Sequence, residues 1–219
     1  MKNTTATRDL AVFSVLIAPI VAWSAWAPKD RFTWWLEVAP VFAGLALAWA
    51  VRARFALSRM LLVFLWLHAV ILLAGGRYTY AEVPLGEWVR ELTGGTRNNY
   101  DKLGHFAQGF VPVLLTREIL LRTSPLGDAA GRATSAWLGF LCGSVALAFS
   151  ALYELIEWVA AELSGEGAEA FLGTQGYVWD TQTDMALALA GAVVALGVLG
   201  RAHGRAVERA VAEKSAARA

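Results

Sequence analysis

Carboxylate and imidazole side chains stand at helical spacing in three separate segments of the chain. Residues three or four apart share one face of an α-helix, so each segment would present its polar groups in one direction. The pairs are Asp101 with His105, Glu154 with Glu157, and Asp180 with Asp184. If the three faces meet, their five carboxylates and one imidazole form a site that can hold a divalent cation or transfer protons.

The Glu154 and Glu157 pair is the hardest to explain without a functional site. Asp180 fits a helix N-cap and Asp184 the first helical turn, where negative charge stabilises a helix. Glu154 and Glu157 instead end a segment that is uncharged from residue 133 to residue 153. Carboxylates at that end oppose the helix dipole, and acids within a membrane face a polar interior or a partner. His68, by contrast, fits an ordinary packing role.

Several carboxylates cannot all stay ionised in one pocket without compensation. Three solutions are open at this point. Some of the acids are protonated, a basic side chain such as Lys102 or Arg97 folds in, or a divalent cation binds. Oxygen ligands suit Mg²⁺, Ca²⁺ or Mn²⁺, and an added imidazole admits zinc or iron. The metal-ligand candidates are Asp101, His105, Glu154, Glu157, Asp180 and Asp184.

The segments that carry these residues belong to a membrane protein. Of the 219 residues, 57% are hydrophobic and only 17% are charged, whereas soluble domains are about 25% charged. Apolar runs of about 17–25 residues are long enough to cross the hydrocarbon layer. The sequence therefore predicts an all-α, polytopic bundle of six transmembrane helices, in contact with membrane lipid. Their expected ranges are Leu10–Trp26, Trp34–Ala50, Leu57–Leu73, Lys102–Leu121, Ala136–Trp158 and Asp180–Leu199.

The ends of the chain are assigned to the same bundle. The apolar run Leu10–Ala27 exceeds a signal-peptide core, so we expect an uncleaved first span. We expect one transmembrane domain over residues 1–199 and a cytoplasmic tail over 200–219, which extends the last helix or frays. The single cysteine, Cys142, lies in an apolar run and is expected to pack there. A net charge of +1 gives no indication of a nucleic-acid partner.

Lysine and arginine residues predict the orientation of the spans. They are concentrated between spans two and three, between spans four and five, and after span six, whereas the connection Val159–Trp179 has none. The positive-inside rule then places both termini in the cytoplasm and that connection outside. Lys29, Arg31 and the segment Arg77–Lys102 run against this trend. In this orientation all three polar faces lie at one depth, near the outer surface.

Three motifs in the same regions resemble those of the YjdF-type bacterial inner-membrane proteins, a family without an assigned activity. They are Tyr100–Phe110 (YDKLGHFAQGF), Tyr153–Trp158 (YELIEW) and Phe171–Met185 (FLGTQGYVWDTQTDM). The Asp-Lys-x-x-His portion also resembles VanZ-like membrane proteins, more weakly. The resemblance implies a multi-pass protein of the bacterial inner membrane and assigns no catalytic role to any residue.

Three kinds of function remain open. The first is a membrane-embedded hydrolase of a lipid or lipid-linked substrate, assisted by a divalent metal ion. In it Glu154, Glu157 and His105 are the catalytic candidates, and Phe171–Trp179 covers the site as a lid. The second is an ion or proton transporter, which the apolar inner halves of the spans disfavour. The third is a structural or accessory protein whose polar cluster locks the helices together. Whether the protein is an enzyme is left open.

Overall fold

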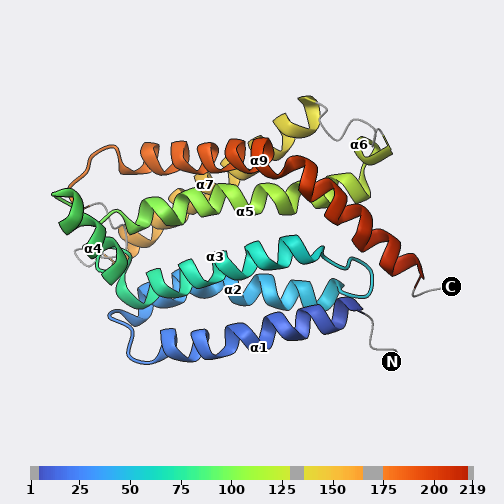
Figure 1. Ribbon diagram of the computed structural model, residues 1–219. Helices are drawn as coiled ribbons and strands as arrows, with labels where there is room; N and C mark the ends of the chain where they lie inside the picture. The colour runs from blue at the N-terminus through green and yellow to red at the C-terminus, as the bar shows by residue number, and fades with distance from the viewer. Residues whose placement is uncertain (1–4, 129–135, 165–174, 217–219) are drawn as a thin grey trace.

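The computed structural model describes residues 5–128, 136–164 and 175–216. Within these ranges the chain is helical and contains no strand, which confirms the all-α prediction. Figure 1 shows the long helices side by side, with both chain ends at the same end of the bundle. The helices are α1 (Thr5–Ala25), α2 (Arg31–Val51), α3 (Arg59–Tyr78), α4 (Pro84–Thr93), α5 (Tyr100–Thr123), α6 (Pro125–Asp128), α7 (Ala136–Ser164) and α9 (Asp180–Ala216).

Two groups of helices make up the bundle, and each has its own apolar core. Helices α1 and α2 pack against α3, around a cluster that includes Ile17, Val38 and Leu73. Helices α7 and α9 pack against α5, around a cluster that includes Leu114 and Cys142. Contacts between α3 and α5 join the two groups. Cys142 is fully buried, as its apolar surroundings in the sequence predicted.

Five of the described helices are long and apolar enough to cross a membrane, namely α1, α2, α3, α7 and α9. Helix α5 differs because it carries charged residues at both ends, including Asp101, Lys102, Arg117 and Glu118. It nevertheless runs alongside α3 and α9 in Figure 1 and packs against α3, α7 and α9. Those neighbours enclose its polar groups, which supports the sixth crossing predicted from the sequence. That crossing and the orientation of the bundle stay predictions.

Local sequence signals define where several helices begin. Asp30 accepts a hydrogen bond from the Thr33 backbone N–H at 2.6 Å and caps α2. Ser58 caps α3 in the same way, accepting from the Leu61 N–H at 3.4 Å. Because the Ser58 cap precedes the helix, α3 begins two residues after the predicted start at Leu57. It continues to Tyr78, beyond the predicted end at Leu73.

Helices α5 and α9 approach each other closely through two glycines. A Cβ atom added at Gly109 would collide with the backbone of Ala188 in α9. One added at Gly191 would collide with the backbone oxygen of Phe106 in α5. Small residues let membrane helices pack with their backbones in contact. This contact brings the first turn of α5 opposite the first turn of α9, where the candidate site lies.

Two features of the chain differ from the sequence prediction. Helix α4 was not predicted, and it lies between the third and fourth predicted spans, across one end of the bundle (Figure 1). Helix α9 runs without a break from Asp180 to Ala216, through the predicted boundary at residue 199. His203 and Val207 in this extension are buried. The tail therefore extends the last helix, one of the two outcomes expected, and the domain boundary stays a prediction.

Candidate functional site

The six site residues predicted from the sequence lie together, in two adjoining groups. The ends of α5, α7 and α9 meet at the same end of the bundle, as the topology required. Among the described residues, two groups have ligand atoms close enough to hold a metal ion, with all atoms of a group within 4.8 Å of one another. We call them the aspartate cluster (Asp101, Asp180 and Asp184) and the histidine cluster (His105, Glu154 and Glu157).

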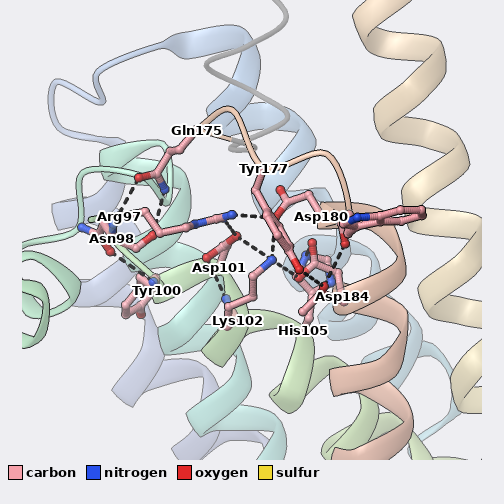
Figure 2. A network of polar contacts seen from close by, with 12 residues as sticks. Arg97, Asn98, Tyr100, Asp101, Lys102, His105, Gln175, Tyr177, Asp180 and Asp184 are labelled. Atoms are coloured by element: carbon pink, nitrogen blue, oxygen red, sulfur yellow. Dashed lines mark hydrogen bonds and ion pairs between the residues drawn. The ribbon is translucent and has the colours of Figure 1, made fainter. Parts of the chain in front are cut away.

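Two basic side chains neutralise much of the aspartate cluster. The Lys102 ammonium lies 2.6 Å from Asp180, 2.8 Å from Asp184 and 3.4 Å from Asp101. The Arg97 guanidinium donates to Asp101 at 2.7 Å and to Asp180 at 2.9 Å. Figure 2 shows both cations between the carboxylates of α5 and α9. Folding in of Lys102 and Arg97, one of the three solutions expected, is therefore what the structure shows at this cluster.

The histidine cluster receives much less compensation. His105 is the basic member of this group, and its ring nitrogens lie 3.8 Å from Glu154 on one side and 3.8 Å from Asp184 on the other. Asp184 thus adjoins both clusters. Gln108 lies 3.1 Å from His105 Nδ1, so its side chain can orient the ring. With the Gln108 carbonyl as acceptor, Nδ1 carries the proton and Nε2 keeps its lone pair.

One oxygen of Glu154 lacks a hydrogen bond. The residue is 8% exposed, and its Oε1 atom is buried without a hydrogen-bond partner. Glu157 is 9% exposed and interacts electrostatically with Glu154. A buried carboxylate oxygen without a donor is costly, so such atoms indicate an ion, a water molecule or a proton that the side chain accommodates. Thr181 also hydrogen-bonds to Glu154. Unlike the aspartate cluster, the histidine cluster has no lysine or arginine within ion-pair distance of its two glutamates among the described residues.

The connection that precedes α9 adjoins the aspartate cluster. Gln175 accepts a hydrogen bond from the Asn98 backbone N–H at 3.1 Å and donates to the Asn98 carbonyl at 2.8 Å. The Tyr177 ring lies 5.6 Å from the Arg97 guanidinium and 5.8 Å from the Lys102 ammonium. Figure 2 shows Tyr177 beside these cations. Of the predicted lid Phe171–Trp179, residues 171–174 lie outside the described residues.

A further group of polar side chains extends the site toward α2, and the sequence analysis did not assign it. The Tyr153 hydroxyl donates to Glu37 Oε2 at 3.1 Å, and Tyr80 also hydrogen-bonds to Glu37. Burial raises the pKa of Tyr80 well above its ordinary value, so its phenol stays a neutral donor. Glu37 and Glu157 interact electrostatically. Glu37 is an acid inside an apolar span, a signal that could have identified it.

His68, considered as an additional member, makes no hydrogen bond with either cluster. Its Nε2 atom is buried without a hydrogen-bond partner. No ion pair within the described ranges joins it to the acids of α5, α7 or α9. His68 therefore joins neither cluster, and its packing role stays a prediction.

A second buried polar group lies toward the other end of α5 and α9, and we call it the Glu118 network (Ser58, Arg117, Glu118, Arg122 and His203). Glu118 is fully buried and accepts hydrogen bonds from the Ser58 N–H and hydroxyl at 2.9 and 2.6 Å. Arg122 donates to it at 2.9 Å, and His203 Nε2 lies 3.4 Å from it. The Arg117 guanidinium lies 3.0 Å from His203 Nδ1. The sequence analysis did not connect these residues, although Arg117 and Glu118 are charged residues within the predicted span Lys102–Leu121.

Comparison with known proteins identifies the family. A family model described as a predicted membrane protein (DUF2238) matches residues 10–205. The chain belongs to the DUF2238 family. It is also 46% identical over 209 residues to the inner membrane protein YjdF of Escherichia coli (strain K12), covering 95% of this chain and 97% of that protein. No solved structure matches it.

The DUF2238 match confirms the resemblance to YjdF-type proteins stated from three motifs. Together with the five apolar helices, it establishes a multi-pass protein of the inner membrane, surrounded by lipid. The matched region includes all six predicted site residues. The names of the family and of the relative describe a location in the membrane and state no reaction.

Proposed function

We propose that this DUF2238 protein is a membrane-embedded hydrolase that uses a divalent metal ion to act on a lipid or lipid-linked substrate. The observation that carries the proposal is the buried Glu154 Oε1 atom without a hydrogen-bond partner, which faces His105. A purely structural cluster would be expected to pair this oxygen, as the acids of the aspartate cluster are paired. A ligand that supplies positive charge satisfies Glu154 and reduces its repulsion with Glu157.

The histidine cluster is the better place for the ion. His105, Glu154 and Glu157 offer one nitrogen and two carboxylates, a donor set suited to zinc, iron or manganese. Asp184 is the nearest additional ligand, since its Oδ2 atom lies 3.8 Å from His105 Nε2. Asp101 and Asp180 already contact Arg97 and Lys102, so we assign them to holding those cations. The six residues predicted from the sequence then form one site, in which the histidine cluster binds the ion and the aspartates hold Arg97 and Lys102.

The residues have separable roles in hydrolysis. An ion at the histidine cluster would polarise the scissile group and lower the pKa of a bound water. Gln108 orients the His105 ring, with Nδ1 on the side of Glu154 in α7 and Nε2 on the side of Asp184 in α9. A carboxylate that is not fully occupied as a ligand, Glu154 or Glu157, serves as the general base. In the predicted orientation the site lies at the outer end of the bundle, at the depth of lipid headgroups.

The arrangement of the aspartate cluster favours a second candidate, a structural role. Its three carboxylates and two cations tie the start of α5 to the start of α9, as a polar lock between helices would. A transporter receives less support. The apolar cluster around Leu114, Val113 and Ala192 separates the site from the Glu118 network, so the described polar residues do not form a continuous path.

Metal analysis of the protein purified in native lipid tests the proposal. We expect one stoichiometric transition metal in the wild type and its loss in Glu154→Gln, with the elution profile of the folded protein retained. Glu162→Gln is the matched control, because Glu162 is an exposed carboxylate on the same helix. Wild-type protein should also release product from envelope lipids in mass spectrometry, and a chelator should abolish this release. A metal content that is equally low in all three proteins would leave the structural role as the better proposal.

A further inference from the structure

Helix α4 presents a continuous strip of apolar side chains to its surroundings. Four large apolar residues occupy positions i, i+3, i+4 and i+7 of this ten-residue helix. They are 44–67% exposed: Leu85, Trp88, Val89 and Leu92. Side chains at this spacing line one face of a helix. In a soluble protein such a strip would be expected to face the core, yet here the described residues leave it uncovered.

The other two sides of α4 differ in character: one is charged and one packs against the protein. The charged residues Glu87, Arg90 and Glu91 lie opposite the apolar strip, and Arg90 forms an ion pair with Glu87. Gly86, between the two faces, is the buried residue of the helix. A Cβ atom at Gly86 would collide with the Asn98 side chain, so this side contacts the protein. The helix therefore has one side for the protein, one charged side and one apolar side.

The position of α4 in the bundle indicates the environment of its apolar side. Figure 1 shows α4 across the end of the bundle where α3 ends and α5 and α9 begin. Exposed tryptophans mark that end on other helices: Trp26 at the end of α1, Trp35 at the start of α2, Trp158 near the end of α7 and Trp179 before α9 are 58–78% exposed. Tryptophans concentrate at membrane–water interfaces. Trp88 of α4 is likewise 58% exposed and continues this set.

We propose that α4 is an interfacial helix, which lies in the membrane surface with its apolar strip against the acyl chains and its charged face in water. Its amphipathic pattern is that of helices that bind in the plane of an interface. The helix also holds the candidate site in place, since the buried Asn98 side chain donates to the Val83 carbonyl at 3.0 Å. Arg97, the adjacent residue, binds Asp101 and Asp180. An α4 helix held in the membrane surface would thereby set the depth of Arg97 relative to the bilayer. This inference does not depend on a metal ion.

Spin labels on the two faces of α4 test the proposal in liposomes of phosphatidylethanolamine and phosphatidylglycerol. Single cysteines replace Trp88, Leu92, Glu87 and Glu91 in a Cys142→Ala background, because Cys142 is the one native cysteine. Oxygen concentrates in the bilayer, whereas a nickel chelate stays in water. We expect the ratio of oxygen to nickel accessibility to be high at 88 and 92 and low at 87 and 91. Leu85→Cys and Val89→Cys replace the first pair if either fails to fold.

Two results would overturn the proposal. Equal, water-like accessibility on both faces would place α4 in solution. Low accessibility to both reagents at 88 and 92 would mean that protein covers the strip, either a second copy of this chain or another partner. A 3.6-residue period in the accessibility ratio from 85 to 92 would support it. Metal content is unaffected by this experiment, so failure of the metal proposal and failure of this one are distinguishable.

Discussion

The aspartate and histidine clusters lie where α5 and α9 begin, with two glutamates supplied by α7, and the Glu118 network lies farther along the same two helices. The two regions satisfy their charges differently. In the Glu118 network both carboxylate oxygens accept hydrogen bonds, from Ser58 and Arg122, and His203 Nε2 lies 3.4 Å away. In the histidine cluster two glutamates lie beside one imidazole within 4.8 Å, and Glu154 Oε1 stays without a hydrogen bond. Burial of charge is common to both regions. An excess of acceptors separates a site that can take a ligand from a network that holds helices together.

The largest effect is expected from removing the centre of the filled network. Glu118→Ala leaves Arg122 and His203 buried without their carboxylate and should lower the free energy of unfolding by about 3–5 kcal/mol. Unfolding in mixed detergent micelles measures this change. Glu208→Ala is the control, since Glu208 is exposed on α9. Equal effects of the two variants would contradict a structural role for the Glu118 network.

Removing a cation from the aspartate cluster should cost less. Lys102→Met leaves three aspartates with Arg97 alone and should destabilise by about 1.5–3 kcal/mol, the range for hydrogen bonds to charged groups. Lys102 is 16% exposed, so water offsets part of the loss. The exposed Lys29, paired with Glu82, gives the control Lys29→Met, for which less than about 1 kcal/mol is expected. A rise in melting temperature for Lys102→Met would show that Lys102 does not stabilise the cluster.

The close backbone contact between α5 and α9, on which both polar regions lie, can be tested by adding one methyl group. Gly191→Ala forces α9 away from the Phe106 backbone and should destabilise by about 1–3 kcal/mol, as overpacking does. Gly197→Ala on the same helix meets no atom within 4 Å and should be neutral or slightly stabilising. Thermal unfolding followed by tryptophan fluorescence compares the two. If the two alanines behave alike, α5 and α9 are not in backbone contact at Gly191.

The smallest stability effect, and the sharpest contrast with Glu118→Ala, is expected at Glu154. Glu154→Gln removes a charge that lacks full compensation, so the free energy of unfolding of the metal-free protein should change by less than about 1 kcal/mol or rise. Unfolding of chelator-treated wild-type and Glu154→Gln protein in mixed detergent micelles measures this change in free energy. A loss as large as that of Glu118→Ala would mean that Glu154 is paired and would remove the basis of the metal proposal.

The sequence by itself determined the membrane bundle and the residues of the candidate site. Apolar runs of membrane-crossing length dictate helices, because only internal hydrogen bonds satisfy the backbone in lipid. The spacing of Asp101 with His105, Glu154 with Glu157 and Asp180 with Asp184 dictates shared faces. Alternation of the spans then brings those faces to one end of the bundle, which needs no knowledge of packing.

Only the tertiary structure decided how the charges are shared. The sequence left three solutions open, namely protonated acids, a basic side chain such as Lys102 or Arg97, and a divalent cation. The contacts of α5 with α9 assign Lys102 and Arg97 to the aspartates and leave Glu154 with an oxygen that lacks a hydrogen bond. Glu118 and His203 lie 85 positions apart in the chain, so no local pattern connects them. Pairing between distant residues depends on side-chain packing in three dimensions, whereas helix formation and spacing are local properties of the chain.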